Sequence, residues 1–307
     1  GAANEVTGPQ AVIETYAINS SATAPTAETY ATLGVMGVTA ENLAAVNAEI
    51  AAVGTVEGVN TPEKIQALVK QVVAEAALTS ISAAAQADNA ASTSLAQSVY
   101  EDAGVTGVVS ASILADINAL LDTANIDGAA TDTTGEVQAL VDGYIAIQTA
   151  ADGTADNNAN DPTQADYAAI GVTGVDDAEE EALLGDVIDS KNAADVNTQG
   201  EVQALADAVQ SVMDAAAGAA DKPTKAELEA LGITGVTTDN LAAIQQAIAA
   251  TSDDGTGVDD LGELQTLATN AAAAAATALT SISAAADAND AASTSLAQSV
   301  YEDAGVT

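Results

Sequence analysis

Apolar residues recur along most of the chain with the spacing of an amphipathic helix. In one segment Leu43, Val46 and Ile50 stand three and four positions apart, which places them on one stripe of a helix. A half-buried strand would instead alternate apolar and polar residues with a period of two, and no segment does so convincingly. The pattern therefore predicts an all-α fold with no sheet.

A short glycine phrase, Gly-Val/Ile-x-Gly-Val, punctuates the helical pattern. It occupies residues 34–38, 104–108, 171–175 and 232–236, and it begins again at residue 305. An aromatic residue or a leucine stands four positions before the first glycine in every copy: Tyr30, Tyr100, Tyr167, Leu228 and Tyr301. Because glycine adopts the left-handed backbone that ends a helix at little cost, we expect a first helix to close at each phrase.

Capping signals predict where the helices of each module begin. The first helix follows a Pro-Thr pair in three copies, at residues 25–26, 162–163 and 223–224. The second helix is expected to open at Thr39, near Ser110, at Asp176 and at Thr237. The third helix has its capping residue at Thr61, Thr133, Thr198 and Asp260, followed by proline in the first case and by a glutamate three positions later in the others. Each module thus carries three predicted helices.

The modules form a tandem array. Residues 77–106 and 278–307 differ at only three positions, which indicates a duplication. We expect residues 1–23 to be the last helix of a preceding module and residues 293–307 the first helix of a following one, so that both ends lie inside a longer array. Four three-helix modules lie between them: 24–91, 92–160, 161–221 and 222–292. Because cores this small are marginally stable alone, we expect neighbours to stabilise one another along an elongated rod.

Composition narrows the choice of partners. The 307 residues include 45 acidic side chains against 5 lysines and arginines together, a formal net charge of −40. Such a surface repels nucleic acid and anionic lipid, so we expect neither as a partner. We also expect no membrane insertion, because no strongly apolar run is long enough to span a bilayer. The expected partners are neighbouring modules and other copies of the chain, while the identity of any protein ligand stays open.

The residue types present exclude most catalytic sites. The chain has no histidine, cysteine or arginine, so it has no Ser-His-Asp or Cys-His nucleophile, no zinc site of the usual kind and no bidentate clamp for phosphate. The glycine phrase is not a phosphate loop, because it follows a helix and lacks the required spacing. Two carboxylates alone could serve a glycosidase, but a sugar cleft normally needs aromatic platforms and a larger fold. We therefore predict no enzyme and no organic cofactor.

Acidic loops leave one candidate metal site. Asp152, Asp156 and Asp161 lie in an oxygen-rich linker between two modules. A loop of this kind could hold calcium and stiffen a joint. The linker lacks the spacing of an EF-hand, and a solvated polar loop is the simpler interpretation, which we favour. Calcium is the one cofactor that the sequence leaves possible.

Three phrases in the modules resemble a known family. Residues 226–234 read Ala-Glu-Leu-Glu-Ala-Leu-Gly-Ile-Thr, residues 240–244 read Asn-Leu-Ala-Ala-Ile, and residues 61–68 read Thr-Pro-Glu-Lys-Ile-Gln-Ala-Leu. They resemble the GA module, the albumin-binding three-helix bundle of bacterial surface proteins. They are also similar to repeats in giant secreted adhesins and biofilm matrix proteins of Gram-negative bacteria. The resemblance implies three-helix bundles and an extracellular or cell-surface location.

Two classes of function remain. In the first, the array is a stalk, spacer or fibre-forming segment of a secreted adhesin or extracellular matrix protein. In the second, each module presents a helix face to a host or matrix protein. We favour the structural class, because apolar side chains at helical spacing form cores more often than contact surfaces.

Overall fold

The computed structural model describes residues 8–87, 94–154, 161–251, 255–287 and 296–306. All regular secondary structure in these ranges is helical, and the one β-type contact among them is an isolated antiparallel bridge between Asp152 and Asn192. The prediction of an all-α fold is therefore confirmed for the described residues. The module boundaries expected after residues 91, 160 and 292 lie outside these ranges.

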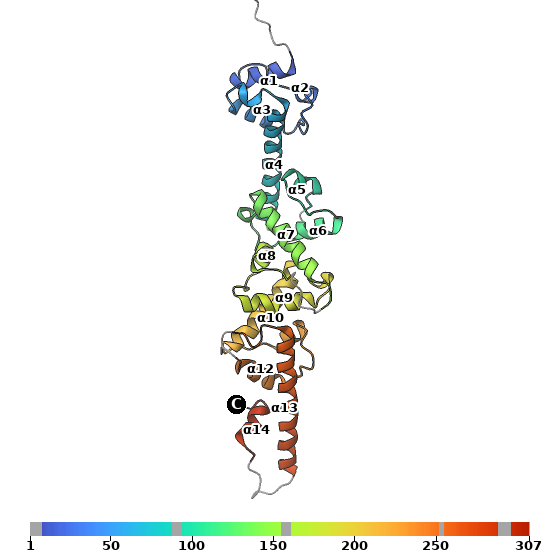
Figure 1. Ribbon diagram of the computed structural model, residues 1–307, viewed down its shortest axis with the longest axis vertical. Helices are drawn as coiled ribbons and strands as arrows, with labels where there is room; N and C mark the ends of the chain where they lie inside the picture. Colours follow the sequence, from blue (N-terminus) through green and yellow to red (C-terminus); the bar gives the residue numbers. More distant parts are fainter. Residues whose placement is uncertain (1–7, 88–93, 155–160, 252–254, 288–295, 307) are drawn as a thin grey trace, which may run out of the picture. The chain divides into compact units, whose positions relative to one another are not determined.

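The chain forms two compact units, Gly1–Gln138 and Ala139–Thr307, and the division falls inside one helix, α7 (Thr134–Ala150). The first unit contains α1 (Pro9–Ile18), α2 (Ala27–Thr32), α3 (Leu43–Ala52), η1 (Glu57–Val59), α4 (Pro62–Gln86), α5 (Gln97–Asp102), α6 (Ala111–Leu121) and η2 (Gly128–Ala130). After α7, the second unit contains α8 (Gln164–Ala169), α9 (Ala178–Asp189), η3 (Ala193–Asp195), α10 (Gln199–Ala216), α11 (Lys225–Ala230), α12 (Leu241–Ala249), α13 (Leu261–Asp287) and α14 (Gln298–Asp303). The order of first, second and third helices recurs as the sequence predicts (Figure 1).

Side-chain caps start the first and third helices at the predicted residues. Thr26, Thr163 and Thr224 each form a capping box at the start of α2, α8 and α11. Thr198 forms the same arrangement with Glu201 at the start of α10. These bonds satisfy backbone N–H groups that have no partner inside the helix.

The second helices begin later than predicted in three modules. α3 and α12 begin four residues after Thr39 and Thr237, because side chains first close a turn there. The N–H of Thr39 donates to Asn42 Oδ1 at 2.8 Å, and that of Thr237 donates to Asn240 Oδ1 at 2.7 Å. In α9 the cap is Asp177, one residue beyond the predicted position.

Each first helix ends at the glycine phrase. The first glycine of the phrase has φ between 77° and 95° in all five copies, the left-handed region that other residues enter only with strain. The next residue donates its N–H to the carbonyl of the tyrosine or leucine five positions earlier, at 2.9–3.0 Å. This pair of features is the Schellman ending of a helix, and it confirms the predicted role of the glycine.

The third helix α4 takes part in two cores of the first unit. Its N-terminal half contributes Ile65 and Val69 to a core that also contains residues of α1, α2 and α3. Its C-terminal half buries Ala77, Ile81 and Ala85 and packs against α5, α6 and η2 (Figure 1). The end of one third helix therefore completes the core of the next module.

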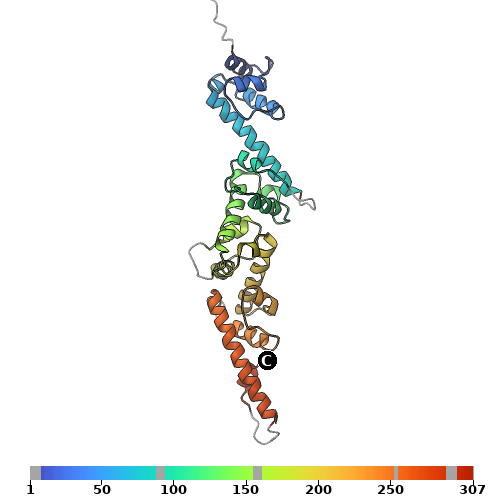
Figure 2. The same cartoon turned by 90° about the vertical axis from the view of Figure 1, so that its right-hand side faces the viewer.

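An apolar pair four positions apart marks the end of each third helix that a following module covers. The pairs are Ile13 and Ala17, Ile81 and Ala85, Ile147 and Ala151, and Val212 and Ala216, each residue between 0% and 4% exposed. Residues four positions apart lie on one face of a helix. In the second unit α10 packs against α9 and also against α11 and α12, and α13 packs against α12 and α14 (Figure 2).

One helix among the described residues, α4, reaches the length and mean hydropathy of a membrane-spanning helix. Lys70 and Glu75 interrupt its apolar residues. Ile65, Val69 and Ile81 are fully buried against other helices of the protein. The same length and hydropathy are therefore met here by a helix that serves two protein cores.

Candidate functional site

Two of the three predicted calcium ligands, Asp152 and Asp161, lie in described parts of the chain. Asp152 is exposed, and its Oδ1 accepts the N–H of Thr154 at 2.8 Å. Asp161 is half-buried beside Gly185, where an added Cβ would lie 3.0 Å from the Cβ of Asp161. Asp156 lies outside the described residues. No group of three or more acidic side chains in the described ranges is arranged to hold a metal ion, and calcium binding stays a prediction.

A glutamine at the start of each third helix makes a two-point contact with the glycine phrase. In the first module Gln66 Oε1 accepts the N–H of Met36 at 2.7 Å, and Gln66 Nε2 donates to the Met36 carbonyl at 3.0 Å. The same two bonds join Gln138 to Thr106, Gln203 to Thr173 and Gln265 to Thr234. We call this contact the glutamine clamp.

The backbone of the phrase explains why a glutamine is needed. The middle residue stands between two glycines of positive φ, as Met36 does between Gly34 at 77° and Gly37 at 86°. Its N–H and carbonyl therefore have no partner within a helix, and each needs one. A primary amide supplies one acceptor and one donor on neighbouring atoms. The clamp thus fixes the loop after the first helix to the start of the third.

A buried tyrosine and an amide form a second recurring contact. Tyr30 donates its hydroxyl to Asn47 Oδ1 at 2.6 Å, and Asn47 Nδ2 donates to the carbonyl of Pro25 at 2.9 Å. Tyr30 is fully buried, and this burial raises the pKa of its hydroxyl well above the usual value. The phenol therefore stays neutral and serves as a hydrogen-bond donor within the core.

The next module repeats this contact. Tyr100 donates to Asn118 Oδ1 at 2.8 Å, and Asn118 Nδ2 donates to the carbonyl of Leu95 at 3.0 Å. In the module that has Leu228 in place of the tyrosine, Gln245 Nε2 still donates to the Pro223 carbonyl at 2.9 Å. The amide therefore anchors the start of the first helix even where the phenol is missing.

The environment of Tyr167 differs from that of Tyr30 and Tyr100. Gly185 takes the place of an amide-bearing residue on the second helix, and the Asp161 side chain packs against it. Burial raises the pKa of Tyr167, and the charges of Asp161 and Glu181 raise it further. The tyrosine hydroxyl has no hydrogen-bond partner there. Asp161, predicted as a calcium ligand, thus lies in the packing of this module.

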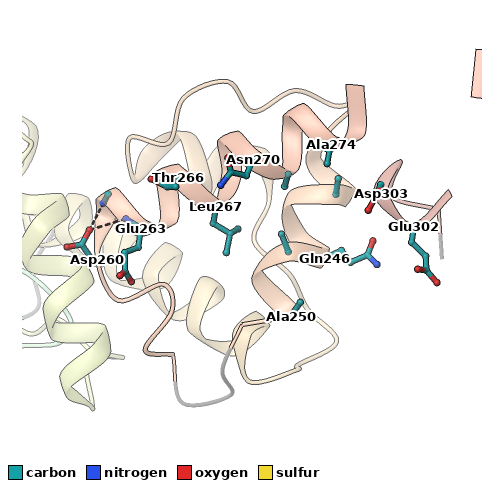
Figure 3. Close-up of a pocket in the computed structure, with 14 residues that line it drawn as sticks. Gln246, Ala250, Asp260, Glu263, Thr266, Leu267, Asn270, Ala274, Glu302 and Asp303 are labelled. Atoms are coloured by element: carbon teal, nitrogen blue, oxygen red, sulfur yellow. Dashed lines mark hydrogen bonds between the residues drawn. The ribbon is translucent and has the colours of Figure 1, made fainter. Parts of the chain in front are cut away.

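An open groove lies in the second unit. It has a volume of about 930 Å³ and lies along α12, α13 and α14 (Figure 3). Its apolar lining comes from alanines and one leucine: Ala243, Ala247, Ala250, Leu267, Ala271 and Ala274. Carboxylates stand at its two ends, with Asp260 and Glu263 at one and Glu302 and Asp303 at the other (Figure 3).

The first unit has an equivalent groove along α3, α4 and α5. Its volume is about 790 Å³, and its lining includes Ala45, Ala48, Val72 and Asp102. In the groove of the second unit, Asp260 Oδ1 already accepts the N–H groups of Gly262 and Glu263 at 2.7 and 3.0 Å. Both grooves thus combine a lining of small apolar residues with carboxylates.

The sequence interpretation missed the glutamine clamp. A signal for it does exist, because each third helix carries Ile, Val or Leu, then Gln, and then Leu two positions later, at residues 65–68, 137–140, 202–205 and 264–267. The apolar members of this phrase face the core, and nothing in the phrase itself shows which group the glutamine contacts. Only the fold brings it to a phrase about 30 positions earlier.

Comparison of the chain with protein-family models, with curated proteins and with solved structures gave no match.

Proposed function

We propose that the chain is a structural repeat region of a secreted bacterial surface adhesin or extracellular matrix protein. In this proposal each module is a three-helix bundle, and successive bundles form a rod that provides reach or assembles into fibres. Partners are neighbouring modules and other copies of the chain, at the cell surface or outside the cell. The proposal also assigns no enzymatic activity to the array.

The sharing of one helix between two cores carries this proposal. α4 completes the core of one module with Ile65 and Val69 and that of the next with Ile81 and Ala85. A continuous helix transmits force and orientation from one module to its neighbour, and each module gains stability from the interface. Repeated modules joined in this way suit a part whose use depends on copy number.

The recurring polar contacts support the same interpretation. The glutamine clamp and the tyrosine–amide pair fix loops and helix starts, and the side-chain groups that form them bond to other groups of the protein. The chain lacks histidine, cysteine and arginine, and its net charge of −40 favours solubility. These are properties of a spacer.

The near-identical segments begin at residues 77 and 278, so the sequence repeats after 278 − 77 = 201 residues. The test is to shorten the array by whole repeats of this length in the protein that carries it, while leaving the ends of that protein intact. A spacer loses adhesion reach or fibre dimension gradually with each repeat removed. A matched control exchanges one module for another without changing the length, and it should leave both properties unchanged. Abrupt loss on removal or exchange of one particular module would overturn the proposal.

A second candidate is a GA-like module that recognises a host or matrix protein. The observation in its favour is the alanine-lined groove along the second helix α12, with Leu267 on its floor (Figure 3). A direct test measures binding of serum albumin and of matrix proteins to the immobilised chain. Saturable binding that is lost in Ala247→Arg and kept in Ala272→Arg, which lies outside the groove lining, would favour this candidate over the spacer.

A further inference from the structure

One sequence occurs twice in the chain in two different surroundings. Residues 77–106 form the end of α4 and all of α5, and residues 278–307 form the end of α13 and all of α14. They differ only at positions 86, 88 and 89 of the first copy. A difference in exposure between the copies therefore reports what covers each one.

The first helix of the later copy is far more exposed. Tyr100 is 0% exposed, whereas the equivalent Tyr301 is 41% exposed. Val105 is 3% exposed, and the equivalent Val306 is 56% exposed. Large apolar side chains that are core residues in one copy thus lie at the surface in the other.

The end of the third helix shows the same difference. Ile81 and Ala85 are 0% and 1% exposed. The equivalent Ile282 is half-buried and Ala286 is exposed. The apolar pair that is covered at the ends of four other third-helix segments is therefore open at the end of α13.

In the first unit the cover comes from the segment that follows the repeated sequence. α4 packs against α6 and η2 there, and Asn118 of α6 accepts the hydroxyl of Tyr100 at 2.8 Å. Ser82 Oγ donates to the Gly128 carbonyl of η2 at 2.7 Å. Thr134, at the start of α7, donates to the Ala103 carbonyl at 2.8 Å. Residues 107–138 thus supply both apolar and polar contacts to this sequence.

The turn after the first helix also has a different neighbour in each copy. A Cβ at Gly104 would meet Thr134 at 3.6 Å, in ordinary contact. A Cβ at Gly305 would lie 2.8 Å from the Cβ of Ala242. The turn therefore lies against α12 in the second unit and faces the start of the third helix in the first unit.

We propose that the open face of α13 and α14, formed by Ile282, Ala286, Tyr301 and Val306, is a docking surface for another module of the same type. The occupant is the second helix, the 3-10 turn and the start of the third helix of that module, in the arrangement that residues 107–138 have in the first unit. We call this surface the terminal face. The inference deepens the array proposal and rests on it for the source of the occupant.

The groove beside α14 is not the docking surface. Its equivalent along α3, α4 and α5 is present in the first unit, where α6 and η2 pack against α4 and contribute no residue to the groove lining. A docked module would therefore cover the terminal face and leave the groove open.

The test extends the full chain after Thr307 with a second copy of residues 107–160. The new junction reproduces the natural one, because the residues before it repeat those before Gly107. The chain has no tryptophan, so Tyr301→Trp supplies a single fluorescent reporter at the terminal face. Tyr100→Trp in the unextended chain gives the reference for the covered state. The matched control carries the same extension with Ile117→Asp and Leu121→Asp in the added copy.

Docking predicts that the extension shifts the emission at position 301 to shorter wavelength and lowers its quenching by acrylamide to the value of the Tyr100→Trp reference. The control extension should leave both unchanged. Because tryptophan is larger than tyrosine, fluorine NMR of the extended chain labelled with 3-fluorotyrosine provides a second measurement, with Tyr301→Phe to assign the signal. An unchanged environment at position 301 by both methods would overturn the inference.

Sedimentation of the unextended chain tests the remaining explanation, in which the terminal face binds a second copy of the chain. A dimer that Tyr301→Asp dissociates would assign the terminal face to a second copy and would also overturn the inference as stated. The docking result and the array-shortening result are independent. Modules that do not dock could still form a spacer of independent domains joined by linkers, and modules that dock could still prove to bind a ligand.

Discussion

The glutamine clamp gives the sharpest test of how each module is held together. Gln66→Glu keeps an oxygen that accepts the N–H of Met36, but it replaces the donor to the Met36 carbonyl with a second acceptor. Gln66→Met removes both bonds without introducing a charge. The pair of variants therefore separates the loss of hydrogen bonds from the opposition of two acceptors.

The expected size follows from the geometry. A neutral hydrogen bond contributes about 0.5–1.5 kcal/mol net, and Met36 is 77% exposed, so water partly replaces the lost partners. We expect Gln66→Met to cost the loop about 1 kcal/mol. Gln66→Glu should cost about 1–2 kcal/mol at neutral pH, because the carboxylate also faces the carbonyl oxygen. Acid should restore most of this loss, since a protonated carboxyl regains a donor.

Native-state hydrogen exchange of the Met36 amide measures these effects directly. A cost of about 1–2 kcal/mol lowers its protection factor by about 5- to 30-fold. Gln71→Met is the matched control, because Gln71 lies on the same helix and its side chain bonds to Glu75 instead of to the glycine phrase. Unchanged protection of Met36 in both Gln66 variants, or an equal loss in Gln71→Met, would refute the role of the clamp.

Three further predictions concern packing, pH and salt. Gly143→Ala should lower the free energy of unfolding, measured by urea denaturation, by about 1–3 kcal/mol, because the added Cβ would lie 2.6 Å from the Asp166 carbonyl oxygen. An added Cβ at Gly200 has nothing within 4 Å, so Gly200→Ala should raise the free energy of unfolding by about 0.5–1 kcal/mol. Equal effects of the two changes would contradict this packing. Burial and the charges of neighbouring aspartates raise the pKa of the Asp186 carboxyl, so its ionisation costs stability as pH rises from the unfolded pKa through the folded one; Asp186→Asn should therefore raise the melting temperature at pH 7 but not below pH 4, and a difference that persists in acid would count against this cause. With a net charge of −40 the chain should melt at lower temperature in low salt. A rise in melting temperature with calcium beyond that with sodium at equal ionic strength, lost in the double variant Asp156→Asn with Asp161→Asn, would identify a calcium site. Equal melting temperatures in the two salts would show that charge screening accounts for the whole effect.

Local signals predicted most of the helices. Thr26, Thr198 and Thr224 cap helices as their spacing indicates, because a cap depends on residues three positions apart and on little else. The glycine endings were predictable for the same reason. The starts of α3 and α12 were predicted too early, because Asn42 and Asn240 compete with the backbone and close a side-chain turn first.

Contacts between distant segments could not be predicted. The clamp joins Gln66 to Met36 across 30 positions, and the recurring phrase around the glutamine marks its position without showing which backbone groups it contacts. The tyrosine–amide pair joins Tyr30 to Asn47 across two helices. Both depend on how the three helices of a module pack against one another, which the helical periodicity leaves undetermined.

The third helices differ in how much of their length is buried. α10 has 18 residues and buries residues along its whole length, from Val202 to Ala216, so the cores that it serves adjoin. α13 has 27 residues but buries only Leu264, Ala268, Ala275 and Ala278. α4 has 25 residues and buries six of them, from Ile65 to Ala85, so length alone does not decide how much of a third helix is covered. Local opening needs the least free energy where few side chains are buried. We therefore expect the amides in the middle of α13 to exchange with solvent faster than those of α4 and α10, and equal protection in all three helices would contradict this interpretation of the packing.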